Sequence, residues 1–81
     1  MGQDRLQDLV AYIASSLVDD PDAVEVNVVE EDRAVVLELT VAPDDLGKVI
    51  GKEGRTARAM RTLLAATSAR MRKRAILDIL E

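Results

Sequence analysis

Residues 46–55 read Leu46-Gly47-Lys48-Val49-Ile50-Gly51-Lys52-Glu53-Gly54-Arg55. A four-residue loop within this stretch has glycine at both ends, Gly51 and Gly54, with Lys52 and Glu53 between them. Glycine adopts backbone angles closed to other residues, and it has no Cβ to block a close approach. Such a loop can place its own amide groups against phosphate, where the following helix also directs the positive end of its dipole. The sequence predicts an anion-binding loop between two helices.

Other glycine-rich phosphate motifs do not fit this stretch. A P-loop requires four residues between its glycines and Ser or Thr after its lysine, but Gly47 and Gly51 enclose three residues and Glu53 follows Lys52. The dinucleotide-binding fingerprint requires glycine where Val49 stands. The alternative without a ligand is a tight helix–helix turn, because glycine is common after helices.

Basic side chains surround the loop. Lys48 precedes it, Lys52 lies within it, and Arg55, Arg58 and Arg61 follow at three-residue spacing. At roughly 100° per residue the three arginines share one face of a helix. They have no acidic partner at helical spacing, and unpaired like charges one turn apart repel each other. An ordinary solvated helix face is the alternative, but the pattern favours a surface that binds a polyanion.

Charge is divided unevenly along the chain, although the net charge is −4. Residues 1–46 carry 2 basic and 12 acidic side chains, whereas residues 47–81 carry 9 basic and 3 acidic ones. This asymmetry indicates either a polyanion-binding half or two halves that pair with each other. A second basic cluster is formed by Arg70, Arg72, Lys73 and Arg74. It either contributes to binding or stabilises the negative end of a helix dipole.

Hydrophobic periodicity predicts the elements outside the loop. A helix is expected over 4–18, two antiparallel strands over 24–28 and 34–41, a short helix from Pro43 to Ile50, a long helix over 54–70 and a strand over 73–80. The order is helix, strand, strand, helix, helix, strand. It predicts an α+β domain spanning residues 1–81, with a three-stranded sheet and three helices on one face.

Two faces of these elements carry further expectations. The long helix is expected to pack through Ala57, Met60, Leu63, Leu64 and Thr67. In the last strand Ala75, Leu77 and Ile79 are expected to face inward. That register leaves Ile76 and Leu80 on the outer face, which indicates a covering partner or a register one residue different.

Composition excludes several classes of function. The chain has neither cysteine nor histidine, which removes disulfides, Cys/His metal sites and triads using either residue. Asp44 and Asp45 read as carboxylates at a helix start and not as a catalytic pair. No apolar run approaches the roughly 20 residues of a membrane span, and the first residues lack the pattern of a signal peptide. We expect a cytoplasmic protein without enzyme activity, cofactor, metal, membrane contact or small-molecule substrate.

The loop and its surroundings resemble a known family. Val49-Ile50-Gly51-Lys52-Glu53-Gly54, in this order of elements, resembles the KH domain with its G-x-x-G loop, in the type II arrangement. Similarity to the bacterial KhpA family extends through Leu9-Val10-Ala11-Tyr12-Ile13, Leu17-Val18-Asp19-Asp20-Pro21, Val36-Leu37-Glu38-Leu39 and residues 41–52.

The resemblance implies a function and partners. It implies a cytoplasmic protein that binds single-stranded RNA, described as an RNA chaperone, that forms dimers and pairs with the KH protein KhpB. It also implies a link to cell elongation and cell-wall homeostasis. The loop role is expected at Gly51, Lys52, Glu53 and Gly54, with Lys48, Arg55, Arg58 and Arg61 beside it. Val49 and Ile50 are expected either to form the floor of a base groove or to pack in the core. Because Tyr12 is the one aromatic residue, base stacking on aromatics is not expected. One alternative is a protein-interaction module. Another is duplex-DNA binding by a helix-turn-helix, which the G-x-x-G turn and the flanking sheet disfavour.

Overall fold

The computed structural model describes residues 2–69 and 71–81 and confirms the predicted order of elements. Two residues lie outside the described ones: Met1, the first residue of the predicted domain, and Arg70, a member of the second basic cluster. The helices and strands are α1 (Gly2–Leu17), β1 (Glu25–Glu30), β2 (Ala34–Thr40), α2 (Leu46–Ile50), α3 (Arg55–Thr67) and β3 (Arg74–Ile79). Short 3₁₀ turns form at η1 (Pro21–Ala23), η2 (Pro43–Asp45) and η3 (Lys52–Gly54).

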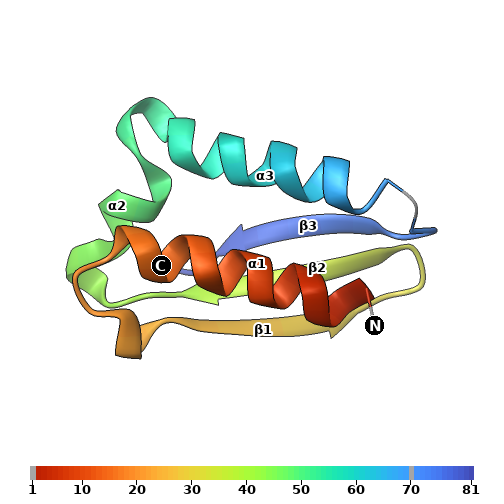
Figure 1. Cartoon of the computed structure of the whole chain (residues 1–81), viewed down its shortest axis with the longest axis horizontal. Coiled ribbons are helices and arrows are strands. Elements are labelled where there is room, and N and C mark those ends of the chain that lie inside the picture. The colour runs from red at the N-terminus through yellow and green to blue at the C-terminus, as the bar shows by residue number, and fades with distance from the viewer. Residues whose placement is uncertain (1, 70) are drawn as a thin grey trace.

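The three strands form one mixed sheet with β2 in the centre. β1 pairs antiparallel with β2, and β3 pairs parallel with β2 on its other side. The helices lie on one face of this sheet, with α1 over β1 and β2 and α3 over β3 (Figure 1). The fold is therefore the α+β arrangement of a type II KH domain.

The core lies between the sheet and the helices. Alternation along β2 buries Val35, Leu37 and Leu39, while Glu38 points to the opposite, open face. The pairing of Leu37 with Leu77 continues this layer onto β3. Full burial of a leucine side chain contributes roughly 1.5–3 kcal/mol. Val26 of β1 and Val41, which follows β2, are also buried. The buried apolar side chains of the helices are Leu6, Val10, Ala14, Val49, Ala57, Met60 and Leu64.

Two expectations for α3 are wrong. The helix ends at Thr67 and not at Arg70, because Ser68 has left the helical region (φ −91°, ψ 7°) and begins the turn toward β3. The buried face also includes Ser68 and leaves Leu63 and Thr67 exposed. Leu63 is rotated by about 100° from the centre of the face that packs on the sheet.

The register of β3 is as predicted. Leu77 is buried and Ala75 and Ile79 are half-buried, whereas Ile76 and Leu80 are exposed on the open face. Ile76 lies beside Val36, which lies beside Val29, so the three form an apolar row across the sheet. The neighbouring row consists of Asn27, Glu38 and Asp78.

Candidate nucleic-acid interface

The backbone of the η3 loop turns sharply between α2 and α3. Gly51 has φ 80° and ψ 168°, a region that is essentially closed to residues with a Cβ. Glu53 (φ 58°) and Gly54 (φ 75°) both adopt left-handed conformations. Glu53 is the one non-glycine residue with positive φ among residues 2–69 and 71–81. The two glycines therefore allow a reversal that other residues resist.

Gly51 is required on steric grounds as well. A Cβ added to it would collide with the side chain of Thr56 and lie 2.8 Å from the backbone nitrogen of Thr56. Gly54 has open space around the corresponding position. The first glycine thus brings the end of α2 against the first turn of α3.

Two amide groups at the tip of the loop are free to bind a ligand. Within the loop, the N–H of Gly51 donates to the carbonyl of Gly47, and the N–H of Gly54 donates to that of Gly51. The N–H groups of Lys52 and Glu53 donate to no residue that the structure describes. Both residues are exposed. Two adjacent donors on a glycine-flanked turn, at the N-terminus of α3, form a suitable seat for one phosphate group.

The cations around this seat differ in what they already contact. Lys52 is exposed and has no ion-pair partner among the described residues. Arg55 lies 3.4 Å from the carboxylate of Glu53, in a highly exposed pair of little energetic weight. Arg58 donates to the backbone carbonyl of Glu53 at 3.3 Å and thereby links α3 to the loop. Lys52 is therefore the loop cation whose charge is not engaged by a described residue.

Arg61 connects α3 to the outer edge of the sheet. Its guanidinium donates to the backbone carbonyl of Leu77 at 3.5 Å. Arg74 and Leu80 direct their N–H groups toward β2, so alternation along a parallel strand turns the backbone groups of Leu77 and its odd-numbered neighbours to the free edge. Apart from the carbonyl of Leu77, which Arg61 occupies, this edge presents backbone donors and acceptors that do not bond to β2.

An open groove of about 510 Å³ lies between the start of α3 and the end of β3. Ile50, Ala57 and Ile79 supply apolar surface, and Arg58 and Arg61 supply charge. Gly54 and Glu81 complete the lining. The groove therefore begins at the loop and combines an apolar floor, cations and a strand edge.

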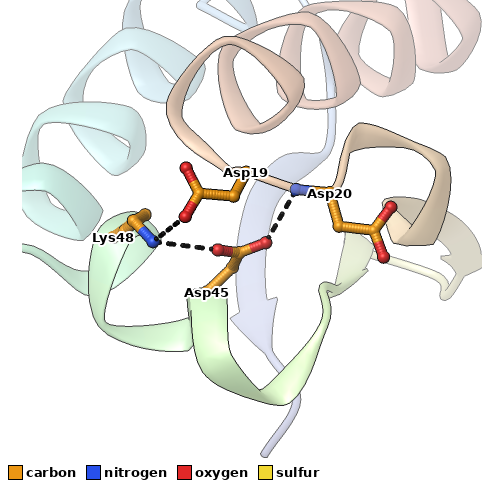
Figure 2. A network of polar contacts seen from close by, with 4 residues as sticks. All are labelled: Asp19, Asp20, Asp45 and Lys48. Atoms are coloured by element: carbon orange, nitrogen blue, oxygen red, sulfur yellow. Dashed lines mark hydrogen bonds and ion pairs between the residues drawn. The ribbon is translucent and has the colours of Figure 1, made fainter.

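Lys48 is placed differently from the other predicted cations. Its ammonium lies 2.8 Å from the carboxylate of Asp19 and 3.1 Å from that of Asp45 (Figure 2). Asp45 is buried and also accepts the backbone N–H of Asp20 at 3.0 Å. This network joins the beginning of α2 to the segment that follows α1, so Lys48 serves the fold on the side of α2 away from the groove lining.

The network shifts the pKa of both of its central groups. Burial raises the pKa of Asp45, but the hydrogen bonds from Lys48 and from the backbone of Asp19 and Asp20 outweigh it, and the net pKa lies below the ordinary value. Hydrogen bonds to Asp19 and Asp45 raise the pKa of Lys48 above its ordinary value. Sequence reasoning read Asp45 only as a helix-start residue. The i, i+3 spacing of Asp45 and Lys48 was the available signal.

Val49 and Ile50, the two apolar residues before the loop, lie in different environments. Val49 is fully buried in the core, whereas Ile50 is half-buried and lines the groove. Of the alternatives left by the sequence, core packing applies to Val49 and groove lining applies to Ile50. Arg72, Lys73 and Arg74, the described members of the second basic cluster, lie at the opposite end of α3 from the loop.

The described part of the chain contains neither a metal-binding cluster nor a membrane-spanning helix. Residues 2–69 and 71–81 contain no group of three or more acidic, cysteine or histidine side chains that could hold a metal ion. None of the helices described is long and apolar enough to cross a membrane.

Comparisons with known proteins identify a family that the chain matches over most of its length. The family model described as "KhpA/KhpB, KH domain" matches residues 7–79. A protein of Caldanaerobacter subterraneus subsp. tengcongensis named RNA-binding protein KhpA is 52% identical over 73 residues, covering 90% of this chain and 97% of its own length. Proteins of the same name from Aquifex aeolicus (51% identical, 94% of this chain and 96% of the relative) and Borreliella burgdorferi (47%, 91% and 90%) are also similar.

The match spans nearly all of the described elements, from α1 to the end of β3, and includes the G-x-x-G loop and both helices beside it. The relatives bear the name of an RNA-binding protein, and the matching family model is that of a KH domain. The chain belongs to the KhpA/KhpB family of KH-domain proteins.

Proposed function

We propose that this protein binds single-stranded RNA, with the backbone held at the Gly51–Gly54 loop and the following nucleotides lying in the groove between α3 and β3. The observation that carries the proposal is the pair of free N–H groups of Lys52 and Glu53 at the glycine-flanked tip. A G-x-x-G loop of this kind holds about four nucleotides by their backbone. The relatives named RNA-binding protein KhpA support the same assignment.

The groove favours recognition without aromatic stacking. Tyr12, the one aromatic residue, lies on α1 and does not line the groove. The floor from Ile50, Ala57 and Ile79 accepts the flat faces of bases, while the free edge of β3 offers backbone donors and acceptors to base edges. Affinity then depends mainly on Lys52, Arg55, Arg58 and Arg61 and decreases with salt.

Family membership supports a wider proposal for the protein's role. We propose that it acts in the cytoplasm as an RNA chaperone or post-transcriptional regulator, as a homodimer and together with a KhpB-type protein. The name of the matching family, which joins KhpA and KhpB, supports the pairing. The link to cell elongation and cell-wall homeostasis rests on the resemblance to the family alone.

RNA binding is tested by reversing the charge of the loop tip. The double variant Lys52→Asp/Glu53→Asp should lose binding to single-stranded RNA by more than tenfold in a gel-shift or anisotropy titration, because phosphate would meet two carboxylates. Aspartate tolerates the left-handed backbone at residue 53, so the variant should remain folded by circular dichroism. The control Arg5→Asp makes the same change in charge on the exposed face of α1 and should leave binding within a factor of two. Undiminished binding by the folded double variant refutes the role of the loop.

A second candidate function, protein interaction, has one observation in its favour. The open face of the sheet carries the apolar row Val29, Val36 and Ile76, with Val29 41% and Ile76 36% exposed. Such a row suits a dimer partner or a docked protein. Val29→Glu should shift the monomer–dimer balance in analytical ultracentrifugation without affecting RNA binding, because Val29 lines neither cleft beside α3. An unchanged balance counts against this use of the face.

A further inference from the structure

We infer that the far end of the α3–β3 groove holds a second phosphate-binding subsite, so that the RNA track continues past the loop and past the four nucleotides that the loop itself holds. The inference rests on the proposed RNA binding and extends it to a region formed by the start of β3. Its ligand is the sugar–phosphate backbone of the same RNA strand.

A second open cleft of about 480 Å³ lies where α3 ends and β3 begins. Its polar lining includes Arg61, Arg72, Lys73 and Arg74. Its apolar lining is mostly small or aliphatic, with Ala65, Ala69, Met71, Ala75, Ile76 and Leu77. Acidic side chains are missing from this lining, whereas Glu81 lines the groove at the loop.

The two clefts form one path along the same two elements. Arg61 lines both of them, and its contact with the carbonyl of Leu77 marks the place where they meet. β3 runs back along α3, so its last residues lie near the loop and its first residues near the end of α3 (Figure 1). The far cleft is roughly 20 Å from the loop, given the length of α3 and a rise of 1.5 Å per residue.

The cations of the far cleft are not equally available. The ammonium of Lys73 is held by Glu30 at 2.6 Å and is therefore paired within the fold. Arg72 and Arg74 are exposed, and their side chains contact no partner among the described residues. Cations near the carbonyl groups of a helix C-terminus are stabilising, but neither arginine side chain donates a hydrogen bond to the described residues at the end of α3. Both guanidinium groups remain free to hold phosphate in a bidentate manner.

A strand of RNA fits this path better than an acidic peptide does. The path begins at two free N–H groups suited to one phosphate and continues along spaced arginines, which matches a polymer with regularly spaced charge. Residues 1–46 carry 12 acidic and 2 basic side chains, so the electrostatic field of the protein favours a polyanion along this basic path over the rest of the surface.

The test compares two lengths of RNA. An oligonucleotide of about four residues fits the loop groove, whereas one of about twice that length reaches the far cleft. Arg72→Ala/Arg74→Ala should weaken binding of the longer RNA about tenfold and reduce its dependence on salt by about 1.4 in log–log slope, for two lost phosphate contacts. Binding of the shorter RNA should change by less than a factor of two. The single variants Arg72→Ala and Arg74→Ala are compared with Arg5→Ala, which also removes one exposed positive charge.

The outcomes separate this inference from the function on which it rests. Equal binding of the longer RNA by the double variant and the unmodified protein overturns the second subsite while leaving the loop assignment intact. An equal loss for both lengths also overturns it, because the arginines would then act only through general charge. Failure of the unmodified protein to bind either RNA refutes the proposed function itself. Tighter binding of a poly-glutamate peptide than of RNA, lost in the double variant, would assign the cleft to a protein instead.

Discussion

Asp45, a buried carboxylate, accepts a hydrogen bond of 3.1 Å from the ammonium of Lys48, one turn further along the chain. The same carboxylate accepts the N–H of Asp20, so a single side chain connects the start of α2 with the segment after α1 (Figure 2). Because α2 leads directly into the Gly51–Gly54 loop, this pair fixes the position from which the loop projects. Lys48 is paired with carboxylates of the fold, whereas Lys52, four residues later, has no ion-pair partner among the described residues.

The first prediction concerns this division between the two lysines. Lys48→Ala should lower the thermal midpoint by several degrees, because Asp45 would keep its buried charge without its ammonium partner. Lys52→Ala should leave the midpoint nearly unchanged and weaken RNA binding several-fold. Differential scanning calorimetry and RNA titration at a temperature where both variants are folded measure the two effects. An equal loss of RNA affinity in both variants, with no loss of stability, would place Lys48 on the RNA instead.

The second prediction is a pH dependence of stability. The pKa of Asp45 is lowered, so its contribution is present above the ordinary value of 3.8 and is lost as the pH falls through the lower folded value. The pKa of Lys48 is raised, so its contribution is present below 10.5 and is lost as the pH rises through the higher folded value. The free energy of unfolding, measured in urea across this pH range, should show a plateau that falls at both ends. In Asp45→Asn the fall on the acid side should be smaller. An acid limb identical in the two proteins would contradict the assignment.

The third prediction ranks the two loop glycines. Gly51→Ala should destabilise the protein by more than Gly54→Ala, because a Cβ at residue 51 meets Thr56 and its backbone angles cost about 1–3 kcal/mol. At Gly54 space is open, and the cost is that of a left-handed residue, about 1–2 kcal/mol. Denaturant unfolding measures both. Thr56→Ala should not rescue Gly51→Ala, since the backbone nitrogen of Thr56 also lies in the way; full rescue would show that the side chain alone sets the requirement.

The fourth prediction is a gain of affinity at Glu53. Its carboxylate lies at the loop tip and pairs with Arg55, so Glu53→Gln should remove a negative charge from the phosphate seat and release the arginine. RNA affinity should rise several-fold, with little change in stability. Glu25→Gln removes the same charge from β1, at the far edge of the sheet, and should have a smaller effect. Equal gains in the two variants would attribute the effect to net charge.

Much of the fold could be predicted from local patterns. The strand period placed Leu37 inside and Glu38 outside, and the same period left Ile76 and Leu80 on the open face. These predictions succeeded because each depends on a residue's own neighbours in the chain. The predicted end of α3 was wrong because the chain must leave the helix after Thr67 to begin β3. The sequence of residues 68–70 contains no glycine or proline that would indicate this end.

The site was predicted in part for the same reason. The loop residues and the arginines follow from spacing along one helix, and the structure brings Arg58 and Arg61 to the groove. The role of Lys48 depends on Asp19, which lies 29 positions earlier in the chain, so it could not be read from the neighbouring sequence. The predicted packing face of α3 wrongly included Leu63, because its exposure depends on how the helix packs on the sheet and not on the neighbouring sequence.

The amide groups of Lys52 and Glu53 give the most direct test of RNA binding at the loop. In a titration of ¹⁵N-labelled protein with single-stranded RNA, the N–H resonances of these two residues should move downfield and saturate with the RNA, as phosphate accepts both hydrogen bonds. Resonances of Val29 and Val36 on the open face should stay in place. If RNA binds and moves the open-face resonances while those of Lys52 and Glu53 remain unchanged, the loop is not the site that holds the strand.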